Sequence, residues 1–292
     1  MATQVTTYGR EERDLYEAPD FDSFYRSPGA RSLADRFEAL LDRVDLCSFD
    51  VFDTLLLRDE RSELERFRDI AAEFIRRAGA EGPESPLVLR SCLSARILAA
   101  SAAYQLSPAV KGCREGRLSE IIANAVDTLG LPQAPFARIW HEAEMEVETS
   151  QLRASAFIEE LLDLALARGK RVVLVSDMYM PAGDISRLLE ASGISTGKIE
   201  RIFSSADTVV NKRSGLVYDL IAEETGVAPA RMLHMGDALE GDFLAAKRRG
   251  LQAIHLPIPR ALLRRRLDSH RAVLDHLSGE SGLPLPIAPP AL

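Results

Sequence analysis

The sequence has few cysteines, no excess of basic residues and no long apolar run, and each of these absences excludes a class of protein. The 292 residues carry a formal net charge of −8, so the chain lacks the electrostatic footprint of a nucleic-acid-binding protein. No apolar run approaches the length needed to cross a bilayer, and the polar stretch 1–10 lacks the apolar core of a secretory signal. We therefore expect a soluble, cytoplasmic protein with neither a nucleic acid nor a membrane as partner.

The three cysteines, Cys47, Cys92 and Cys113, are odd in number and widely spaced. Cys47 lies in an apolar segment with the pattern of a core strand, so the cysteines are interpreted as buried free thiols in a reducing compartment. With 46% hydrophobic and 27% charged residues, the composition is typical of an ordinary globular protein. A chain of this length can hold one large domain, or a core with an insertion.

The rest of the chain is organised around the stretch 46–58. An apolar run leads to Asp50, and a tight polar turn at Asp53 and Thr54 follows. This pattern predicts a buried parallel strand that brings a carboxylate to the carboxyl edge of a sheet, where ligands of open α/β sheets bind. Later segments also end on small polar or acidic residues and are expected to reach the same edge. These segments are 172–177, 202–205 and 232–237.

Helix and strand alternate regularly after residue 151, and repeated β-α-β units predict a parallel, doubly wound sheet. The helices of this part are predicted at 157–168, 185–191, 216–224 and 243–249, and the last strand at 253–256. Between residues 59 and 151 no segment has the pattern of a strand. Helices are predicted there at 64–78, 87–104, 118–129 and 136–148. A helical block directly after the first strand is an insertion, which we expect to stand over the carboxyl edge like a lid.

The two ends of the chain are less regular. Residues 1–31 are polar with scattered aromatics, and two interpretations stay open: an extended arm that packs on the core through those rings, or a partly disordered tail. A helix at 32–44, with Ser32 as a possible N-cap, is expected to lead into the first strand. A basic helix at 260–277 precedes a loose Pro-rich end, and its run 264–266 of three arginines is interpreted as a solvated face.

At this point the chain resembles a known family. Its strand-ending motifs, in order over about residues 44–257, are similar to those of the haloacid dehalogenase-like (HAD) hydrolase superfamily, and the first motif, 49–56, resembles a branch of predicted HAD hydrolases. The resemblance implies an α/β fold: a Rossmann-like doubly wound parallel sheet with an all-helical cap inserted after the first strand. The expected organisation is an arm at 1–31, a core at 32–61 and 151–258, a cap at 62–150, and a C-terminal helix and tail at 259–292.

The resemblance also implies a magnesium-dependent chemistry. Asp50 is the candidate nucleophile, because a carboxylate can attack phosphorus and form an aspartyl-phosphate. It cannot approach a phosphate dianion unless the negative charges are offset, which Mg²⁺ does when carboxylates and a backbone carbonyl hold it. Asp237 would then be a Mg²⁺ ligand, Asp242 a supporting or water-mediated one, and the carbonyl of Phe52 a further oxygen. Alternatively, Asp242 caps the helix after Gly241.

Other motif residues would bind the phosphoryl group. Ser176 ends a strand where the family has a phosphate-binding Ser or Thr, and Lys212 matches the lysine of the third motif, whose ammonium would offset charge on the nucleophile and on the phosphoryl group. Asp177 is interpreted as a loop cap near the site, and Thr54 as a residue that holds the turn and contacts phosphate. His234, on an apolar strand, is expected to be a satisfied core histidine.

The chain departs from the family pattern at Phe52. Phosphatases of the superfamily usually place a second Asp two residues after the nucleophile, and losing such an acid costs about 10²–10⁴ in rate, or roughly 3–5 kcal/mol of barrier. Three explanations stay open: a leaving group acidic enough to depart unprotonated, a proton supplied by the cap, or a reaction other than monoester hydrolysis. The acids of segment 141–148 are interpreted mainly as a solvated helix face, and two cap arginines as weak candidates for contact with a substrate anion. These residues are Glu142, Glu144, Glu146 and Glu148, and Arg90 and Arg96.

The sequence therefore predicts a Mg²⁺-dependent HAD-type phosphohydrolase that acts on a small phosphorylated metabolite. Its alternatives are cleavage of a carbon–halogen or carbon–phosphorus bond, or a silent scaffold that binds a partner. Retention of Asp237 argues against a metal-free dehalogenase.

Overall fold

A five-stranded parallel sheet lies at the centre of the protein, whose computed structural model describes residues 9–79 and 87–281. The strand order is β5-β4-β1-β6-β7. The strands are β1 (Leu46–Asp50), β4 (Arg171–Ser176), β5 (Arg201–Ser204), β6 (Met232–Gly236) and β7 (Gln252–His255). β1 is central and wholly buried, as expected for a strand covered on both faces. Its register pairs Asp50 with Val175 and Phe49 with Met235, so the carboxyl ends of the central strands meet at one edge.

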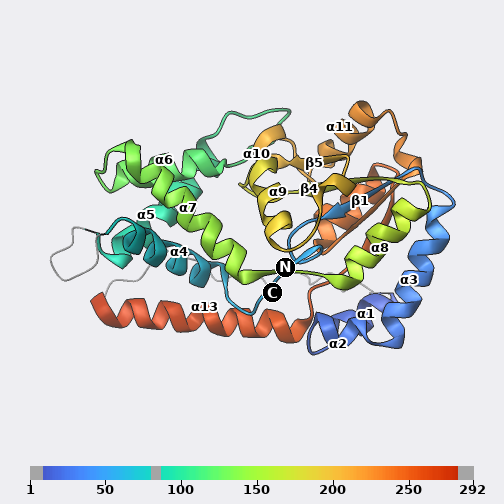
Figure 1. The fold of residues 1–292 in the computed structure, drawn as a ribbon, viewed down its shortest axis with the longest axis horizontal. Coiled ribbons are helices and arrows are strands. Elements are labelled where there is room, and N and C mark those ends of the chain that lie inside the picture. The colour runs from blue at the N-terminus through green and yellow to red at the C-terminus, as the bar shows by residue number, and fades with distance from the viewer. Residues whose placement is uncertain (1–8, 80–86, 282–292) are drawn as a thin grey trace, which may run out of the picture.

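Alternate residues of the strands face two different apolar layers, because successive side chains of a strand point to opposite faces. Cys47 and Phe49 belong to a layer that also contains residues of α3 (Pro28–Leu41), α8 (Ala156–Ala167) and α9 (Ala182–Ala191). Leu46, Val173 and Val175 belong to the opposite layer with α11 (Leu216–Thr225). The predicted α/β, doubly wound class is therefore confirmed, and Figure 1 shows helices on both sides of the sheet.

In the sequence, four helices lie between β1 and the other strands of the sheet, as predicted. They are α4 (Glu63–Arg77), α5 (Leu89–Leu106), α6 (Leu118–Thr128) and α7 (Gln133–Gln151). They pack together beside the sheet, with Trp140 stacked on Phe74 at 4.2 Å between ring centroids (Figure 1). A short antiparallel ribbon, β2 (Leu56–Arg58) with β3 (Leu152–Ala154), joins this helical insertion to the sheet. The ribbon was not predicted, because three-residue strands show no period.

Residues 10–16 and 21–25 are helical, so the prediction of an extended arm or a disordered tail was wrong there. They form α1 (Arg10–Tyr16) and α2 (Phe21–Tyr25), the latter capped by Asp20, which accepts a hydrogen bond from the Ser23 N–H at 2.7 Å. Their aromatics do pack on the core: Phe21 and Phe24 are buried. Residues 1–8 of the predicted arm lie outside the described residues.

The helix before β1 begins earlier than predicted. α3 starts at Pro28, and Ser27 accepts a hydrogen bond from the Ala30 N–H, so Ser27 and not Ser32 is the N-cap. Proline suits the first helical position because its missing N–H would be unpaired there in any case. The remaining helical segments of the core are α10 (Ser205–Thr208), α12 (Ala246–Arg248) and the short helices η1 (Thr196–Lys198), η2 (Pro229–Arg231) and η3 (Leu239–Ala245).

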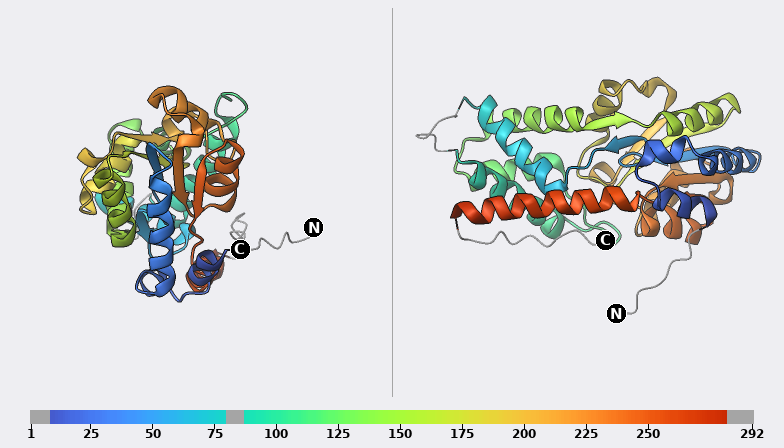
Figure 2. Two further views of the ribbon diagram at one scale, coloured as in Figure 1. Left: turned by 90° about the vertical axis from the view of Figure 1, so that its right-hand side faces the viewer. Right: turned by 90° about the horizontal axis from the view of Figure 1, so that it is seen from below.

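The long helix α13 (Arg260–Ser281) runs along the helical insertion, and its first turns lie near α2, as Figures 1 and 2 show. Its arginines are not all solvated, contrary to the prediction: Arg264 and Arg265 are exposed, whereas the Arg266 side chain is only 13% exposed. The predicted loose Pro-rich end, 282–292, lies outside the described residues. Within the described part of the chain, no helix has the length and apolarity to cross a membrane. All three cysteines are buried free thiols, as predicted.

Candidate active site

Asp50 and Lys212 meet at the carboxyl edge of the sheet. Asp50, the last residue of β1, is 4% exposed, and the Lys212 Nζ lies 2.5 Å from its Oδ1 and 2.6 Å from the Oδ1 of Asp242. The ammonium thus bridges two carboxylates that come from strand ends far apart in the sequence. Burial opposes the charge of Lys212, but these carboxylates raise its pKa well above the usual value, so it stays a cation.

Three carboxylates converge around this lysine. Ligand oxygens of Asp50, Asp237 and Asp242 lie within 4.8 Å of one another. Burial raises the pKa of Asp50 to about 7; the Asp242 charge also raises it, while Lys212 lowers it. Burial and the Asp50 charge raise the pKa of Asp237 well above its usual value. The Asp50 Oδ2 is buried without a hydrogen-bond partner among residues 9–79 and 87–281. An unpaired carboxylate oxygen inside a repulsive acidic cluster fits a hard divalent cation such as Mg²⁺.

Asp242 differs from the other two because protein groups already bind both of its oxygens. Its Oδ1 contacts Lys212 and the His234 Nε2, at 2.9 Å, and its Oδ2 accepts the Ala238 N–H at 2.8 Å. Burial alone would raise the pKa of Asp242, but Lys212 and the His234 hydrogen bond outweigh this effect and lower the pKa below its usual value. Asp242 lies inside η3, which is a π-helix, so it does not cap a helix that starts after Gly241. The helix predicted at 243–249 therefore begins earlier, at Leu239.

His234 is a satisfied core histidine, as predicted, but it also holds Asp242. Its Nδ1 lies 2.7 Å from the Ser48 Oγ, and its Nε2 faces the Asp242 carboxylate. This link was not predicted, because its only sign in the sequence is one polar residue, Ser48 or His234, on each of two adjacent buried strands. Because β1 pairs with β6 with Ser48 opposite His234, the two side chains lie side by side in the sheet.

Gly236 allows the carboxylates to approach one another. A Cβ on this residue would lie 2.4 Å from the Asp242 Cγ and 2.7 Å from the Asp50 Cβ, closer than any real contact. Only glycine fits between the end of β6 and these two side chains, because it has no Cβ.

The loop that carries Lys212 is fixed by Asp177. The Lys212 backbone N–H donates to both carboxylate oxygens of Asp177, at 2.9 and 2.8 Å. Asp177 is exposed, but the protein atoms packed around its carboxyl group disfavour the charged form and raise its pKa to about 6. Ser176, the neighbour of Asp177 at the end of β4, is only 2% exposed and lines a cavity together with Asp177 and Asp50.

A cavity of about 410 Å³ encloses these groups. Asp50, Ser176, Lys212 and Asp237 line it from the sheet edge, while Glu63 of α4 and Tyr104 of α5 line it from the helical insertion. Thr54, predicted to contact phosphate, is fully buried and is not among the described residues that line the cavity. The sheet edge and the insertion therefore share one pocket around Asp50.

A family model for haloacid dehalogenase-like hydrolases matches residues 44–250. The chain belongs to this family. Its match spans β1, the helical insertion and β4 to β6, and it confirms the resemblance found in the motifs.

Solved HAD structures are similar at low identity. The 2-haloacid dehalogenase of Pseudomonas syringae pv. Tomato DC3000 is 15% identical, with a TM-score of 0.51 over 73% of this chain and 86% of that one. A HAD-like family hydrolase of Xanthomonas campestris is 18% identical, with a TM-score of 0.44 over 82% and 94% of the two chains. A HAD family enzyme of Bacteroides thetaiotaomicron, in complex with magnesium and inorganic phosphate, is 14% identical, with a TM-score of 0.45 over 73% and 93%. The first shows a shared fold. No curated protein matches the chain.

In this HAD hydrolase the acid nearest to Phe52 is held by another helix. Asp53, in the left-handed region at φ 59°, binds Arg266 of α13 through both oxygens, at 2.7 and 2.8 Å. Burial alone would raise the pKa of Asp53, but Arg266 outweighs this effect and lowers the pKa below its usual value. Asp53 is therefore bound as an anion. Phe52 borders the cavity, and the Arg58 Cζ lies 4.4 Å from its ring centroid.

The glutamates of α7 divide between two faces, so their prediction as a solvated face was half wrong. Glu142 is half-buried and Glu146 is exposed, but Glu144 and Glu148 are buried. They are paired there with arginines, as buried charges must be. The pairs are Arg96 with Glu144 at 2.7 Å and Arg58 with Glu148 at 2.9 Å.

Neither cap arginine proposed from the sequence lines the cavity around Asp50. Arg96 is fully buried in its pair with Glu144, and Arg90 donates a hydrogen bond to the carbonyl of Leu277 at 2.8 Å. A residue that sequence reasoning missed connects the insertion to α10 and to the loop that carries Lys212. Glu115, between α5 and α6, accepts hydrogen bonds from the Ser205 Oγ at 2.8 Å and the Asn211 Nδ2 at 2.6 Å.

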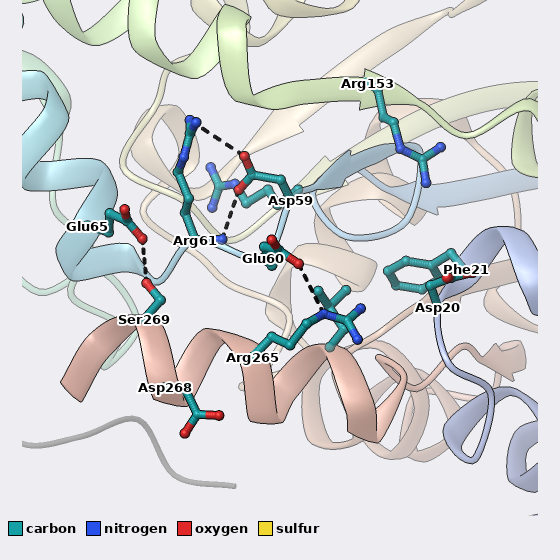
Figure 3. Close-up of a pocket in the computed structure, with 12 residues that line it drawn as sticks. Asp20, Phe21, Asp59, Glu60, Arg61, Glu65, Arg153, Arg265, Asp268 and Ser269 are labelled. Carbon is teal, nitrogen blue, oxygen red and sulfur yellow. Dashed lines mark hydrogen bonds and ion pairs between the residues drawn. The ribbon is translucent and has the colours of Figure 1, made fainter. Parts of the chain in front are cut away.

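A second cavity, of about 560 Å³, lies between α2, β3, the residues 58–61 and α13 (Figure 3). Its charged groups pair with one another: Arg265 with Glu60 at 3.1 Å, and Arg61 with Asp59 at 3.6 Å. Among the described residues, no acidic group of metal-binding geometry lies there, in contrast to the sheet edge. The chemistry of the protein is therefore sought at Asp50.

Proposed function

We propose that the protein is a Mg²⁺-dependent phosphohydrolase that acts on a small phosphorylated metabolite through an aspartyl-phosphate on Asp50. The observation that carries this proposal is the meeting of Asp50, Asp237 and Asp242 within 4.8 Å, around a buried Asp50 oxygen that lacks a hydrogen-bond partner in the described chain. Burying three acids together is costly unless a cation shares them.

Asp50 attacks the phosphorus in this proposal. A bond forms between its carboxylate oxygen and phosphorus, the bond to the leaving group breaks, and water then hydrolyses the acyl phosphate. The Lys212 ammonium, 2.5 Å from Asp50, offsets charge on the carboxylate and on the phosphoryl group. Ser176 donates its hydroxyl to a phosphoryl oxygen from the end of β4.

Asp50, Asp237 and the backbone carbonyl of Phe52 would hold Mg²⁺, with Asp242 in support. When bound, the ion would offset the negative charge of the phosphoryl group. His234 and the Ala238 N–H hold Asp242 in place, and Gly236 leaves the space in which the carboxylates meet.

The helical insertion at 62–150 acts as a cap in this proposal. Glu63 and Tyr104 line the half-open cavity from the helical insertion, and its volume of about 410 Å³ suits a small molecule better than a protein substrate. The partner is accordingly a small phosphorylated metabolite, and neither a nucleic acid nor a membrane.

One observation favours an alternative, cleavage of a carbon–halogen or carbon–phosphorus bond. Phe52 occupies the position of the acid that phosphatases of the family use, so no proton donor stands there for an alcohol leaving group. Asp237 favours the phosphatase, since a metal-free dehalogenase has no need of a second carboxylate beside Asp50, where Asp237 lies half-buried. A silent scaffold is the third alternative.

The test is release of inorganic phosphate and of halide across phosphate esters, acyl phosphates, phosphonates and haloacids, with Mg²⁺ and with EDTA. We expect Mg²⁺-dependent phosphate release that Asp50→Asn abolishes and that Asp45→Asn, at the opposite end of β1, leaves intact. Halide release in EDTA would support the dehalogenase, phosphate release from phosphonates alone the phosphonatase, and no turnover the scaffold.

A further inference from the structure

Arg58 borders the cavity around Asp50 and lies next to Phe52. It is the last residue of β2 and lines the same cavity as Asp50 and Lys212. Its guanidinium carbon lies 4.4 Å from the ring centroid of Phe52, the residue two positions after the nucleophile. The family places a carboxylic acid at that position, so in this chain a cation stacked on an aromatic ring takes the place of a proton donor.

The Arg58 guanidinium is held firmly but keeps donors for a ligand. Its Nη2 donates to the Glu148 Oε2 at 2.9 Å and lies 3.6 Å from the Met178 Sδ. Its Nε is buried without a hydrogen-bond partner in the part of the chain that the structure describes. A ligand cannot reach this covered Nε, but a guanidinium has five N–H donors and the Arg58 side chain is 10% exposed, so an oxygen of a bound ligand would meet the donors outside Nε.

Lys212 and Arg58, two of the cations that line the cavity, have different partners. Lys212 is committed to Asp50 and Asp242, whereas Arg58 pairs with Glu148, a residue of the helical insertion that is 1% exposed. Glu148 thereby fixes the guanidinium against Phe52 without taking part in the sheet-edge cluster. Glu63 is the acid of the insertion that borders the cavity, and it is exposed.

We propose that Arg58 stabilises the leaving-group oxygen by charge in place of an acid, and that the substrate is an acyl phosphate or a phosphoanhydride. This inference rests on the proposed phosphohydrolase function. Asp50 forms its bond to phosphorus, the bond from phosphorus to the leaving oxygen breaks, and the electron pair stays on that oxygen as a carboxylate or phosphate anion beside Arg58. No proton is transferred in this step. Water then cleaves the aspartyl-phosphate, its protons leave with the phosphate product, and the Asp50 carboxylate is restored.

The experiment compares kcat/KM for acetyl phosphate, 4-nitrophenyl phosphate and phenyl phosphate, whose leaving oxygens grow more basic in that order. Charge on the leaving oxygen matters most when that oxygen is basic, so Arg58→Gln should lower kcat/KM by about 10²–10³-fold for phenyl phosphate and about 10-fold or less for acetyl phosphate. Arg58→Lys, which keeps the charge, should recover part of the loss on phenyl phosphate. Glu63→Gln should leave the dependence on the leaving group unchanged.

Two further variants separate this role from folding. Arg58→Gln leaves the buried Glu148 without a cation, so the double variant Arg58→Gln/Glu148→Gln is measured beside it, and Glu148→Gln alone keeps the guanidinium. Thermal unfolding shows which variants are folded. An equal loss on all three substrates in the folded variants, or a steeper dependence in Glu63→Gln, would overturn the role of Arg58. If the wild type releases no phosphate from any substrate, the proposed function itself is wrong and this inference fails with it.

Discussion

The Arg266 guanidinium donates a hydrogen bond to each carboxylate oxygen of Asp53, across 213 residues of chain. The same guanidinium donates to the backbone carbonyls of Arg58 and Asp59, which lead into the helical insertion. Helix α13 thus holds the turn after the nucleophile strand and the start of the connection to α4. The contact explains why Asp53, although adjacent to Phe52, is not free to act as an acid.

We expect Arg266→Ala to destabilise the protein by about 2–4 kcal/mol, because it leaves the Asp53 carboxylate with little solvent and no bidentate partner. Denaturation in urea measures the change. The matched control is Arg264→Ala, because Arg264 belongs to the same run of arginines but is exposed. It should change the free energy of unfolding by less than about 0.5 kcal/mol. Equal effects of the two substitutions would contradict the role given to Arg266.

Magnesium should stabilise the folded protein through Asp237. At 100 times its Kd, an ion that binds only the folded state adds about 2.7 kcal/mol to the free energy of unfolding. We expect Mg²⁺ to raise the Tm of the wild type and not of Asp237→Asn. Since the neighbouring carboxylates repel Asp237, that variant should be at least as stable as the wild type in EDTA.

The matched control for the magnesium experiment is Glu240→Gln, which removes a carboxylate that lines the same cavity but lies outside the metal-type cluster. Its Tm should still rise with Mg²⁺. A Tm that rises equally in Asp237→Asn would show that the ion binds elsewhere.

Gly236→Ala should disrupt the site more than its size suggests. The new methyl group would lie 2.4 Å from the Asp242 Cγ and must push Asp242 and Asp50 apart, at a cost of about 1–3 kcal/mol. We expect loss of phosphate release together with a lower Tm. Gly183→Ala, in α9 with no atom within 4 Å of the new Cβ, is the control and should stabilise the protein by about 0.5–1 kcal/mol. A fully active Gly236→Ala variant would refute the arrangement of carboxylates described above.

The pair His141–Asp184 should make stability depend on pH. The hydrogen bond to Asp184, 2.8 Å long, raises the pKa of His141 in the folded state. A raised pKa means that the folded state favours the protonated ring, so the added stability is complete below about pH 6.5 and is lost as the pH rises through the folded-state pKa.

His141→Gln keeps a polar side chain but not the charge. We expect it to be less stable than the wild type by about 0.5–1 kcal/mol at pH 5.5, a value kept small by partial exposure, and equal to it at pH 9. Urea denaturation at the two pH values measures this. A His141→Gln deficit that is the same at both pH values would contradict the prediction.

The sheet and the carboxylates at its edge could be predicted because their signals are local. Each strand is an apolar run of a few residues, and the residue that ends it, such as Asp50 or Ser176, reaches the edge whatever the rest of the chain does. The order of the motifs then placed Lys212, Asp237 and Asp242 near one another. Their roles in catalysis stay predictions, as does the division into core and cap domains.

What escaped prediction depends on contacts between distant segments. Arg266 reads as one of three solvated arginines, and only the packing of α13 brings it to Asp53. Glu144 and Glu148 read as a surface charge run, because nothing in their own helix announces that Arg96 and Arg58 face them. The helices α1 and α2 were missed for a different reason: they are short, and buried aromatics stabilise them more than helical periodicity does.

The central position of β1 has a consequence for synthesis of the protein. Both of its neighbours, β4 and β6, follow the helical insertion in the sequence, so β1 leaves the ribosome long before any strand exists with which it can pair. Helices form from local contacts and parallel pairing is slow, so the inserted helices should become ordered first, while the apolar strand that ends in Asp50 stays open to aggregation and to chaperones until translation has passed β6.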